Sequence, residues 1–115
     1  LGIEALEFVV KHGEWAPTEA YNLLLFGYLG TKRYDAALER MPKALEVAKK
    51  FPMIFHNAAC IFALRGDLDR ALECTQLAKK HGYDGLAKMS TDDELAPFMT
   101  GKYKKPFLAV FAKKE

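Results

Sequence analysis

The residues best suited to chemistry are a histidine and a cysteine four positions apart. His56 and Cys60 fall within an apolar stretch typical of a helix, so both side chains lie on one face and can reach one metal ion. A structural zinc site takes four ligands, and the other cysteine, Cys74, is expected on a different helix. We therefore expect no metal site and no cofactor, with Cys60 packed and His56 lining a groove.

Two groups of charged residues have further functional interpretations. Asp92, Asp93 and Glu94 could ligate a cation, but acidic residues also favour the N-terminus of a helix, and we prefer that interpretation. Near the C-terminus, lysines alternate with aromatic residues, a combination that binds single-stranded nucleic acid. An amphipathic helix with buried aromatics explains the same pattern, and we prefer it. This segment contains Lys102, Tyr103, Lys104, Lys105, Phe107, Phe111, Lys113 and Lys114.

Catalytic motifs are not found in the sequence. Nucleophilic or acid–base catalysis needs a nucleophile, a base and an orienting group close together. His12, His56 and His81 fall on different predicted elements, and no zinc-protease, phosphate-loop or nucleophile-elbow pattern occurs. We therefore predict that the chain is not an enzyme.

The composition is typical of one small folded domain. The chain has 115 residues, of which 50% are hydrophobic, and 17 basic residues against 15 acidic ones give a net charge of +2. This balance gives no indication that the chain binds nucleic acid or an anionic membrane. No apolar segment approaches the roughly 20 residues of a transmembrane helix. We therefore expect a soluble protein. Two cysteines do not form a disulfide framework, so we expect a reducing, cytoplasmic location.

An internal repeat predicts the elements that position these residues. When the sequence is shifted so that Tyr21 falls on Phe55, identical or similar residues align without a gap. The further aligned pairs are Tyr28 with Phe62, Asp35 with Asp69, Ala37 with Ala71, Leu38 with Leu72, Glu39 with Glu73 and Ala44 with Ala78. Each unit is predicted to contain two helices joined by a short turn. Pro42 lies inside a second helix and predicts a kink near Leu38 to Met41.

Two copies of one motif carry a family resemblance. They are Tyr21-x-x-Leu24-Leu25-x-x-Tyr28 with Ala37-x-x-x-Met41-x-x-Ala44, and Phe55-x-x-Ala58-Ala59-x-x-Phe62 with Ala71-x-x-x-Thr75-x-x-Ala78. This pattern resembles the tetratricopeptide repeat (TPR), whose period of about 34 residues matches the shift between the two copies. It departs from the family at Leu25 and Ala59, where glycine is usual, and at Met41 and Thr75, where an aromatic is usual. The resemblance implies an all-α, right-handed superhelix of antiparallel helix pairs.

The resemblance divides the chain into one domain of four segments. After Gly82 the period is lost, and the remaining sequence is similar to the segment that closes many bacterial TPR arrays. Its aromatics, among them Phe98, are suited to cover the last helix pair. Thr91 and Glu94 have capping-box spacing, and Pro106 suits the first turn of a final helix. The expected segments are a trailing helix of a truncated repeat (1–13), the first repeat (18–51), the second repeat (52–82) and capping helices (83–115).

The function implied by the resemblance is peptide binding. In the family, the first helix of each pair lines a concave surface that binds peptides. The helical register predicts a mostly apolar groove here, suited to an apolar helix or an extended segment of a partner protein. The expected groove residues are Asn22, Phe26, Leu29, Met53, His56 and Cys60, flanked by Glu19 and Ala63, with Asn57 binding the peptide backbone. We therefore expect a non-catalytic scaffold for protein–protein interaction.

Other occupants of the groove remain open. Some family members clamp a C-terminal carboxylate with lysines and asparagines, but Asn22 and Phe26 depart from that pattern, so a clamp is disfavoured. Upstream repeats, the chain's own cap or a second copy could fill the groove instead. The alternative function is then a structural C-terminal cap and self-association module of a longer protein, regulatory to an enzyme domain upstream.

Overall fold

The computed structural model describes residues 2–12, 18–99 and 101–111, and every regular element in this part of the chain is helical. The α-helices are α1 (Ile3–His12), α2 (Thr18–Gly30), α3 (Tyr34–Val47), α4 (Met53–Leu64), α5 (Leu68–Lys80), α6 (Leu86–Ser90) and α7 (Lys104–Val110). Three 3-10 helices are η1 (Ala48–Lys50), η2 (Asp93–Met99) and η3 (Gly101–Tyr103). The predicted all-α class is confirmed. Leu1, Gly13, Lys113 and Lys114, which belong to predicted segments, lie outside the described residues.

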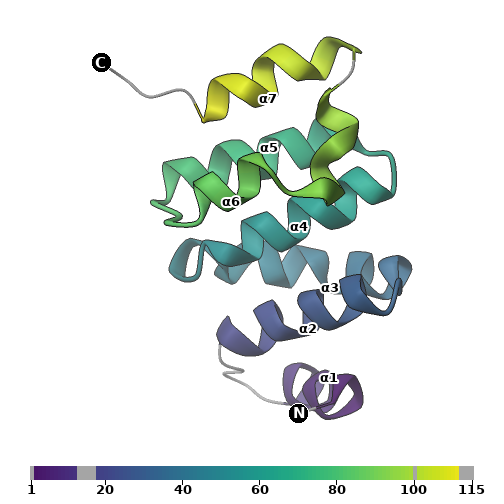
Figure 1. Cartoon of the computed structure of the whole chain (residues 1–115). Coiled ribbons are helices and arrows are strands. Elements are labelled where there is room, and N and C mark those ends of the chain that lie inside the picture. The colour runs from purple at the N-terminus through teal and green to yellow at the C-terminus, as the bar shows by residue number, and fades with distance from the viewer. Residues whose placement is uncertain (1, 13–17, 100, 112–115) are drawn as a thin grey trace.

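The helices stack in the order of the sequence. Helix α2 packs against α1, α3 and α4, helix α4 makes its most extensive contact with α5, and α7 lies on the far side of α5 (Figure 1). Consecutive helices therefore form two pairs, α2 with α3 and α4 with α5. None of the described helices is long and apolar enough to span a membrane.

Helix α4 is the centre of the core. Its buried side chains extend around most of its circumference, because α2, α3, α5 and η2 all pack on it. A helix that is apolar on all sides is typical of the interior of a helical protein. The small residues Ala58 and Ala59 are fully buried and permit close approach of the neighbouring helices. This central position makes α4 the element that organises every candidate site.

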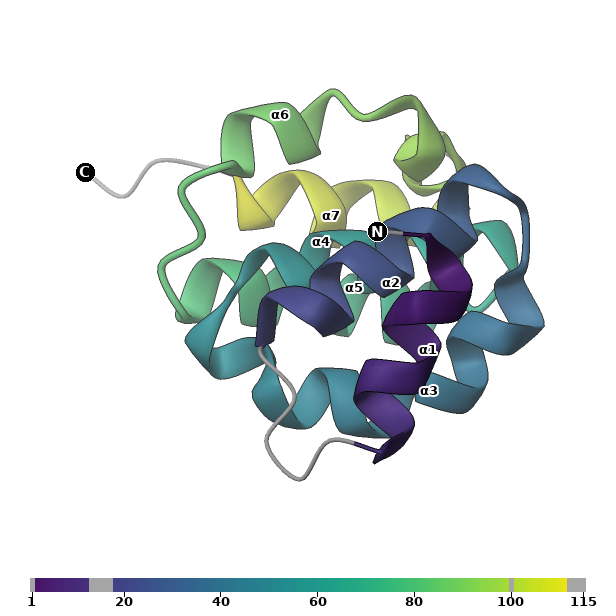
Figure 2. The same ribbon diagram turned by 90° about the horizontal axis from the view of Figure 1, so that it is seen from below.

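The C-terminal segment folds back along α4. Helix α6 and the following η2 lie on one side of α4, while α3 lies on the other (Figures 1 and 2). This packing buries Leu95 and Phe98 of η2, and Phe98 stacks on Phe107 of α7 with ring centroids 4.5 Å apart. The segment after the second repeat therefore covers α4 with its own apolar side chains.

The two helix pairs have equivalent turns. Matching backbone hydrogen bonds of 2.8 Å close them, from Arg33 N–H to the Tyr28 carbonyl and from Asp67 N–H to the Phe62 carbonyl. Gly66 has a φ of 82°, and Lys32, at the equivalent position of the first repeat, has a φ of 59°. Only glycine adopts this left-handed conformation without steric cost, so Lys32 makes the first turn less favourable.

The N-terminal caps of the second helices differ as well. The Asp67 carboxylate accepts a hydrogen bond of 3.2 Å from the Arg70 N–H and caps α5. Arg33, at the same position before α3, makes no side-chain cap hydrogen bond. The second pair therefore begins with a better turn and a better cap than the first.

The capping-box prediction at Thr91 is wrong. The Thr91 hydroxyl donates to the carbonyls of Lys88 at 3.2 Å and Ala87 at 3.5 Å, so it belongs to the end of α6. Asp92 provides the cap instead, because its Oδ1 accepts the Glu94 N–H at 2.9 Å. The cap lies one residue later than expected, which leaves the other oxygen of Asp92 available to α4.

Gly82 and Pro106 lie at helix ends as the sequence predicts, and Pro42 lies inside a helix. Helix α5 is followed by Gly82 with a φ of 77°, which confirms the predicted stop. Pro106 lies near the start of α7, as expected. Helix α3 continues as one α-helix through Pro42.

Candidate functional site

The groove predicted on α4 is closed. Cys60 is 1% exposed and Ala63 is also buried, where the sequence predicts groove residues. His56 is half-buried and contacts the C-terminal segment. The prediction of an open surface at these positions is wrong, because η2 packs on α4 and Tyr83 and Asp92 contact His56 and Cys60. The alternative in which the cap fills the groove describes α4 correctly.

Two predicted groove residues are buried between the repeats. The Asn57 Nδ2 donates to the Asn22 Oδ1 at 2.8 Å, and the Asn22 Nδ2 donates to the Met53 Sδ at 3.5 Å. Asn22 and Asn57 are each 8% exposed, so neither amide is available to bind a peptide backbone as predicted. The two asparagines instead join α2 to α4 in a buried hydrogen bond. Satisfied buried amides of this kind favour one alignment of neighbouring helices.

The remaining groove residues form an open apolar face on α2. Phe26 is 64% exposed and Leu23 is 51% exposed, one turn apart along the helix. Met53 at the start of α4 is 43% exposed, and its contact with Asn22 places it beside α2. Leu29 is partly buried against the core. We call Leu23, Phe26 and Met53 the α2 face. The sequence predicts Phe26 and Met53 as groove residues but not Leu23.

A polar cluster joins α4 to the C-terminal segment. The His56 Nε2 lies 2.7 Å from the Asp92 Oδ2, and the His56 Nδ1 lies 2.7 Å from the Tyr83 hydroxyl. The Cys60 thiol donates to the same Asp92 oxygen at 3.5 Å. One ligand atom from each of His56, Cys60 and Asp92 lies within 4.8 Å of the others. The sequence pattern pairs His56 with Cys60 and groups Asp92 with Asp93 and Glu94, but it does not indicate that the two groups meet.

Burial and hydrogen bonding shift the pKa values of this cluster. Burial alone would raise the pKa of Asp92, but the Glu94 N–H and the His56 ring lower it below its usual value. Burial and the negative charge of Asp92 strongly raise the pKa of the Cys60 thiol. They also raise the pKa of Glu94. Cys60 is therefore a neutral thiol here, and a neutral thiol is a poor nucleophile.

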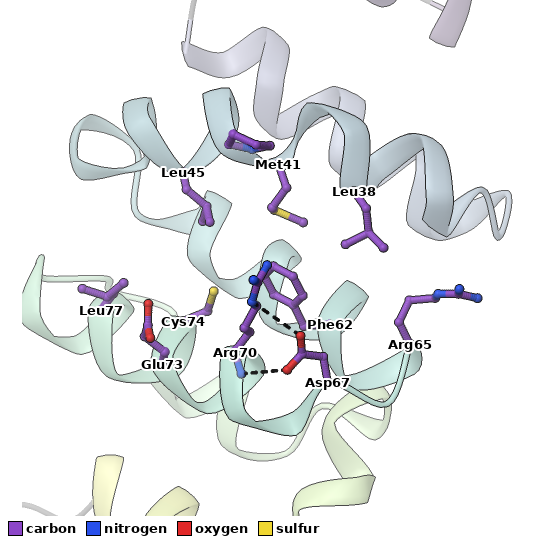
Figure 3. Close-up of a pocket in the computed structure, with 11 residues that line it drawn as sticks. Leu38, Met41, Leu45, Phe62, Arg65, Asp67, Arg70, Glu73, Cys74 and Leu77 are labelled. Carbon is purple, nitrogen blue, oxygen red and sulfur yellow. Dashed lines mark hydrogen bonds and ion pairs between the residues drawn. The ribbon is translucent and has the colours of Figure 1, made fainter.

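A cleft of about 730 Å³ separates α3 from α5. Figure 3 shows Leu38, Met41 and Leu45 extending from α3 toward the α5 side of this cleft. Opposite them, the Arg70 guanidinium lies 5.9 Å from the centre of the Phe62 ring and forms an ion pair with Asp67. One wall is apolar and the other carries the charged residues Arg65, Asp67, Arg70 and Glu73, and the volume suits a small ligand or an inserted side chain. The repeat pattern gives no signal for this cleft, since it identifies the buried faces of helices but not the gaps between them.

Comparisons with known proteins give no relative for this chain. No protein-family model, curated protein or solved structure matches it. Function is therefore inferred from its own residues and contacts.

Proposed function

We propose that this chain is a non-catalytic protein-interaction module of the tetratricopeptide type, and that its α2 face binds a short apolar helix of a partner protein. The observation that carries the proposal is the exposure of Phe26, which is 64% accessible beside an exposed Leu23. Neighbouring apolar side chains on a protein surface mark contact sites. The internal repeat and the two equivalent helix turns support a right-handed superhelix of the tetratricopeptide type.

The covered face of α4 indicates what kind of segment fits. Cys60 occupies the position of the second repeat that Phe26 occupies in the first. There, η2 packs on α4 and buries Leu95 and Phe98 completely, at 1% and 0% exposure. A short helical segment with two apolar side chains three residues apart thus covers this face in the chain's own fold. Within the described residues, no such segment covers the equivalent face of α2.

The residue types on α2 suit this kind of partner. Phe26 provides a large aromatic side chain, the kind that contributes most to binding energy at protein interfaces. Met53 is flexible and polarisable, so it adapts to partner side chains of different shapes. The amides of Asn22 and Asn57 are occupied with each other beneath this surface. Binding therefore depends on apolar contact rather than on recognition of a peptide backbone.

Selection of helical peptides tests the proposal. A displayed library of amphipathic helices is selected against the chain, against Phe26→Lys and against Leu108→Lys. Leu108 is a suitable control because it is 44% exposed on α7, at the opposite end of the stack from α2 (Figure 1). We expect enriched peptides with apolar residues at helical spacing, bound by the chain and by Leu108→Lys but not by Phe26→Lys.

Three results would contradict the proposal. Equal binding by Phe26→Lys would exclude the α2 face, and loss of binding by Leu45→Lys alone would place the site in the α3–α5 cleft. A concentration-dependent dimer, detected by light scattering and lost in Phe26→Lys, would identify a second copy as the occupant. That last result would favour the self-association module.

A further inference from the structure

We propose that His56, Cys60, Asp92 and Glu94 bind one divalent transition-metal ion, best suited to Zn²⁺, which fastens the C-terminal segment to α4. The site is independent of the α2 face. It uses two residues from α4 and two from the segment that begins at the end of α6. Such an ion would act as a structural crosslink between parts of the chain that are far apart in the sequence.

The distances between the candidate ligand atoms fit a small ion. Zn²⁺ bonds nitrogen and oxygen at about 2.0 to 2.1 Å and sulfur at about 2.3 Å, so tetrahedral ligand atoms lie about 3.3 to 3.6 Å apart. The Cys60 Sγ and the Asp92 Oδ2 are 3.5 Å apart. The His56 Nε2 and the Asp92 Oδ2 are 2.7 Å apart, so this pair must separate by about 0.6 Å to admit the ion. The ligand atoms of His56 and Cys60 lie within 4.8 Å of each other, and a bound ion requires them to lie about 3.6 Å apart.

Glu94 is the reason for inferring a cation rather than a closed hydrogen-bond network. In the part of the chain that the structure describes, the Glu94 Oε2 is buried without a hydrogen-bond partner. Glu94 follows Asp92 by two residues, and its backbone N–H donates to the Asp92 Oδ1 at 2.9 Å. Its carboxylate lies outside the group of ligand atoms within 4.8 Å of one another, so it must turn toward the ion to bind it. An unsatisfied buried acceptor is unfavourable, and a bound cation supplies the partner that the Glu94 Oε2 lacks. His56, Cys60 and Asp92 are therefore the three preformed ligands, and Glu94 is the fourth once its side chain rotates toward the ion.

The surroundings of His56 match those of a metal ligand. A ligating histidine commonly makes a hydrogen bond through its second nitrogen, which fixes the orientation of the ring. Here the His56 Nδ1 lies 2.7 Å from the Tyr83 hydroxyl, while the Nε2 points to Asp92. When the ion binds the Nε2, the ring proton resides on the Nδ1 and is donated to the Tyr83 oxygen. The thiol proton of Cys60 is released to solvent, and the sulfur bonds the ion as a thiolate.

The set of donor atoms selects the class of metal. One imidazole nitrogen and one thiolate sulfur favour Zn²⁺, Co²⁺ and related ions over Mg²⁺ or Ca²⁺, which prefer oxygen ligands. With Asp92 in place and Glu94 rotated toward the ion, two carboxylates would complete four positions and leave none for substrate, as in a structural site. The expected role is therefore stabilisation.

Metal titration of the full chain tests the proposal. After treatment with a chelator, the chain is titrated with Co²⁺, which reports thiolate ligation through an ultraviolet charge-transfer band, and with Zn²⁺ in a calorimeter. The matched variants are Cys60→Ala and Cys74→Ala, because both cysteines are free and buried but only Cys60 belongs to the cluster. Far-ultraviolet circular dichroism verifies that each variant is folded.

The expected result is one ion per chain, a Co²⁺–thiolate band and a higher melting temperature with Zn²⁺. Cys74→Ala should retain all three. Cys60→Ala should lose the band and bind Zn²⁺ at least about tenfold more weakly, because loss of a direct ligand costs no less than loss of an outer-shell partner. Asp92→Asn, which preserves the shape of the side chain, should also lose the Zn²⁺-dependent rise in melting temperature. The proposal is overturned if the chain does not bind one ion per chain, or if Cys60→Ala binds Zn²⁺ as tightly as the original chain does.

Discussion

Two equivalent helix faces in this molecule have opposite environments. Phe26 on α2 and Cys60 on α4 occupy the same position of two repeats, yet Phe26 is 64% exposed and Cys60 is 1% exposed. Both helices pair with the following helix through equivalent turns. The difference arises from η2, which packs on α4. The availability of a face is therefore decided by what packs on it and not by the periodicity of its own helix.

The residue types match these two environments. The equivalent pairs are Asn22 with His56, Leu23 with Asn57 and Phe26 with Cys60. On α4 these positions carry small or polar side chains that fit beneath a covering segment and form hydrogen bonds with it or with α2. On α2, two of them carry large apolar side chains suited to an apolar partner. This contrast supports a structural role for the α4 face and a binding role for the α2 face.

Removal of the cover from α4 should have the largest effect on stability. Phe98→Ala deletes a completely buried aromatic that stacks on Phe107, and such truncations lower the free energy of unfolding by about 3 to 5 kcal/mol. Phe26→Ala on the open face should change it by less than about 0.5 kcal/mol. Urea unfolding of both variants measures the difference. Similar losses in the two variants would contradict the distinction between a covered and an open face.

The buried amide pair between the repeats should have an intermediate effect. Asn57→Leu installs the residue that α2 carries at the same position and leaves the Asn22 Oδ1 without its donor. An unsatisfied buried acceptor lowers the free energy of unfolding by about 1 to 3 kcal/mol. The reciprocal variant Leu23→Asn, on the exposed face, should remain within about 0.5 kcal/mol of the original chain. A neutral Asn57→Leu variant would show that this hydrogen bond does not hold the repeats together.

Transfer of the second turn into the first should produce a smaller gain. Lys32→Gly with Arg33→Asp copies the Gly66 and Asp67 arrangement, which relieves a left-handed lysine and adds an N-terminal cap. The cap alone is worth about 0.5 to 2 kcal/mol, so we expect the free energy of unfolding to rise by about 1 kcal/mol. Thermal and urea unfolding measure this gain. A loss of stability would show that the two turns are not interchangeable.

The sequence predicts the helix pairs well because their signals are local. Apolar spacing defines α2 and α4, and Gly82 ends the second repeat. The contact of His56 with Asp92 spans 36 residues and depends on a segment that lacks the period. Burial of Cys60 therefore could not be deduced from its own helix. Asp92 replaced Thr91 as the cap, since either residue type can cap a helix and only the backbone geometry selects one.

Hydrogen–deuterium exchange of the complex tests the central claim most directly. A peptide selected on the chain is added to the chain and to Phe26→Lys, whose stability should be unchanged within about 0.5 kcal/mol. The α2 face predicts slower exchange in α2 (Thr18–Gly30) and about thirtyfold weaker binding by Phe26→Lys, as expected for an interface anchor worth about 2 kcal/mol. Protection confined to α3 and α5, or equal affinity of the two proteins, would contradict it.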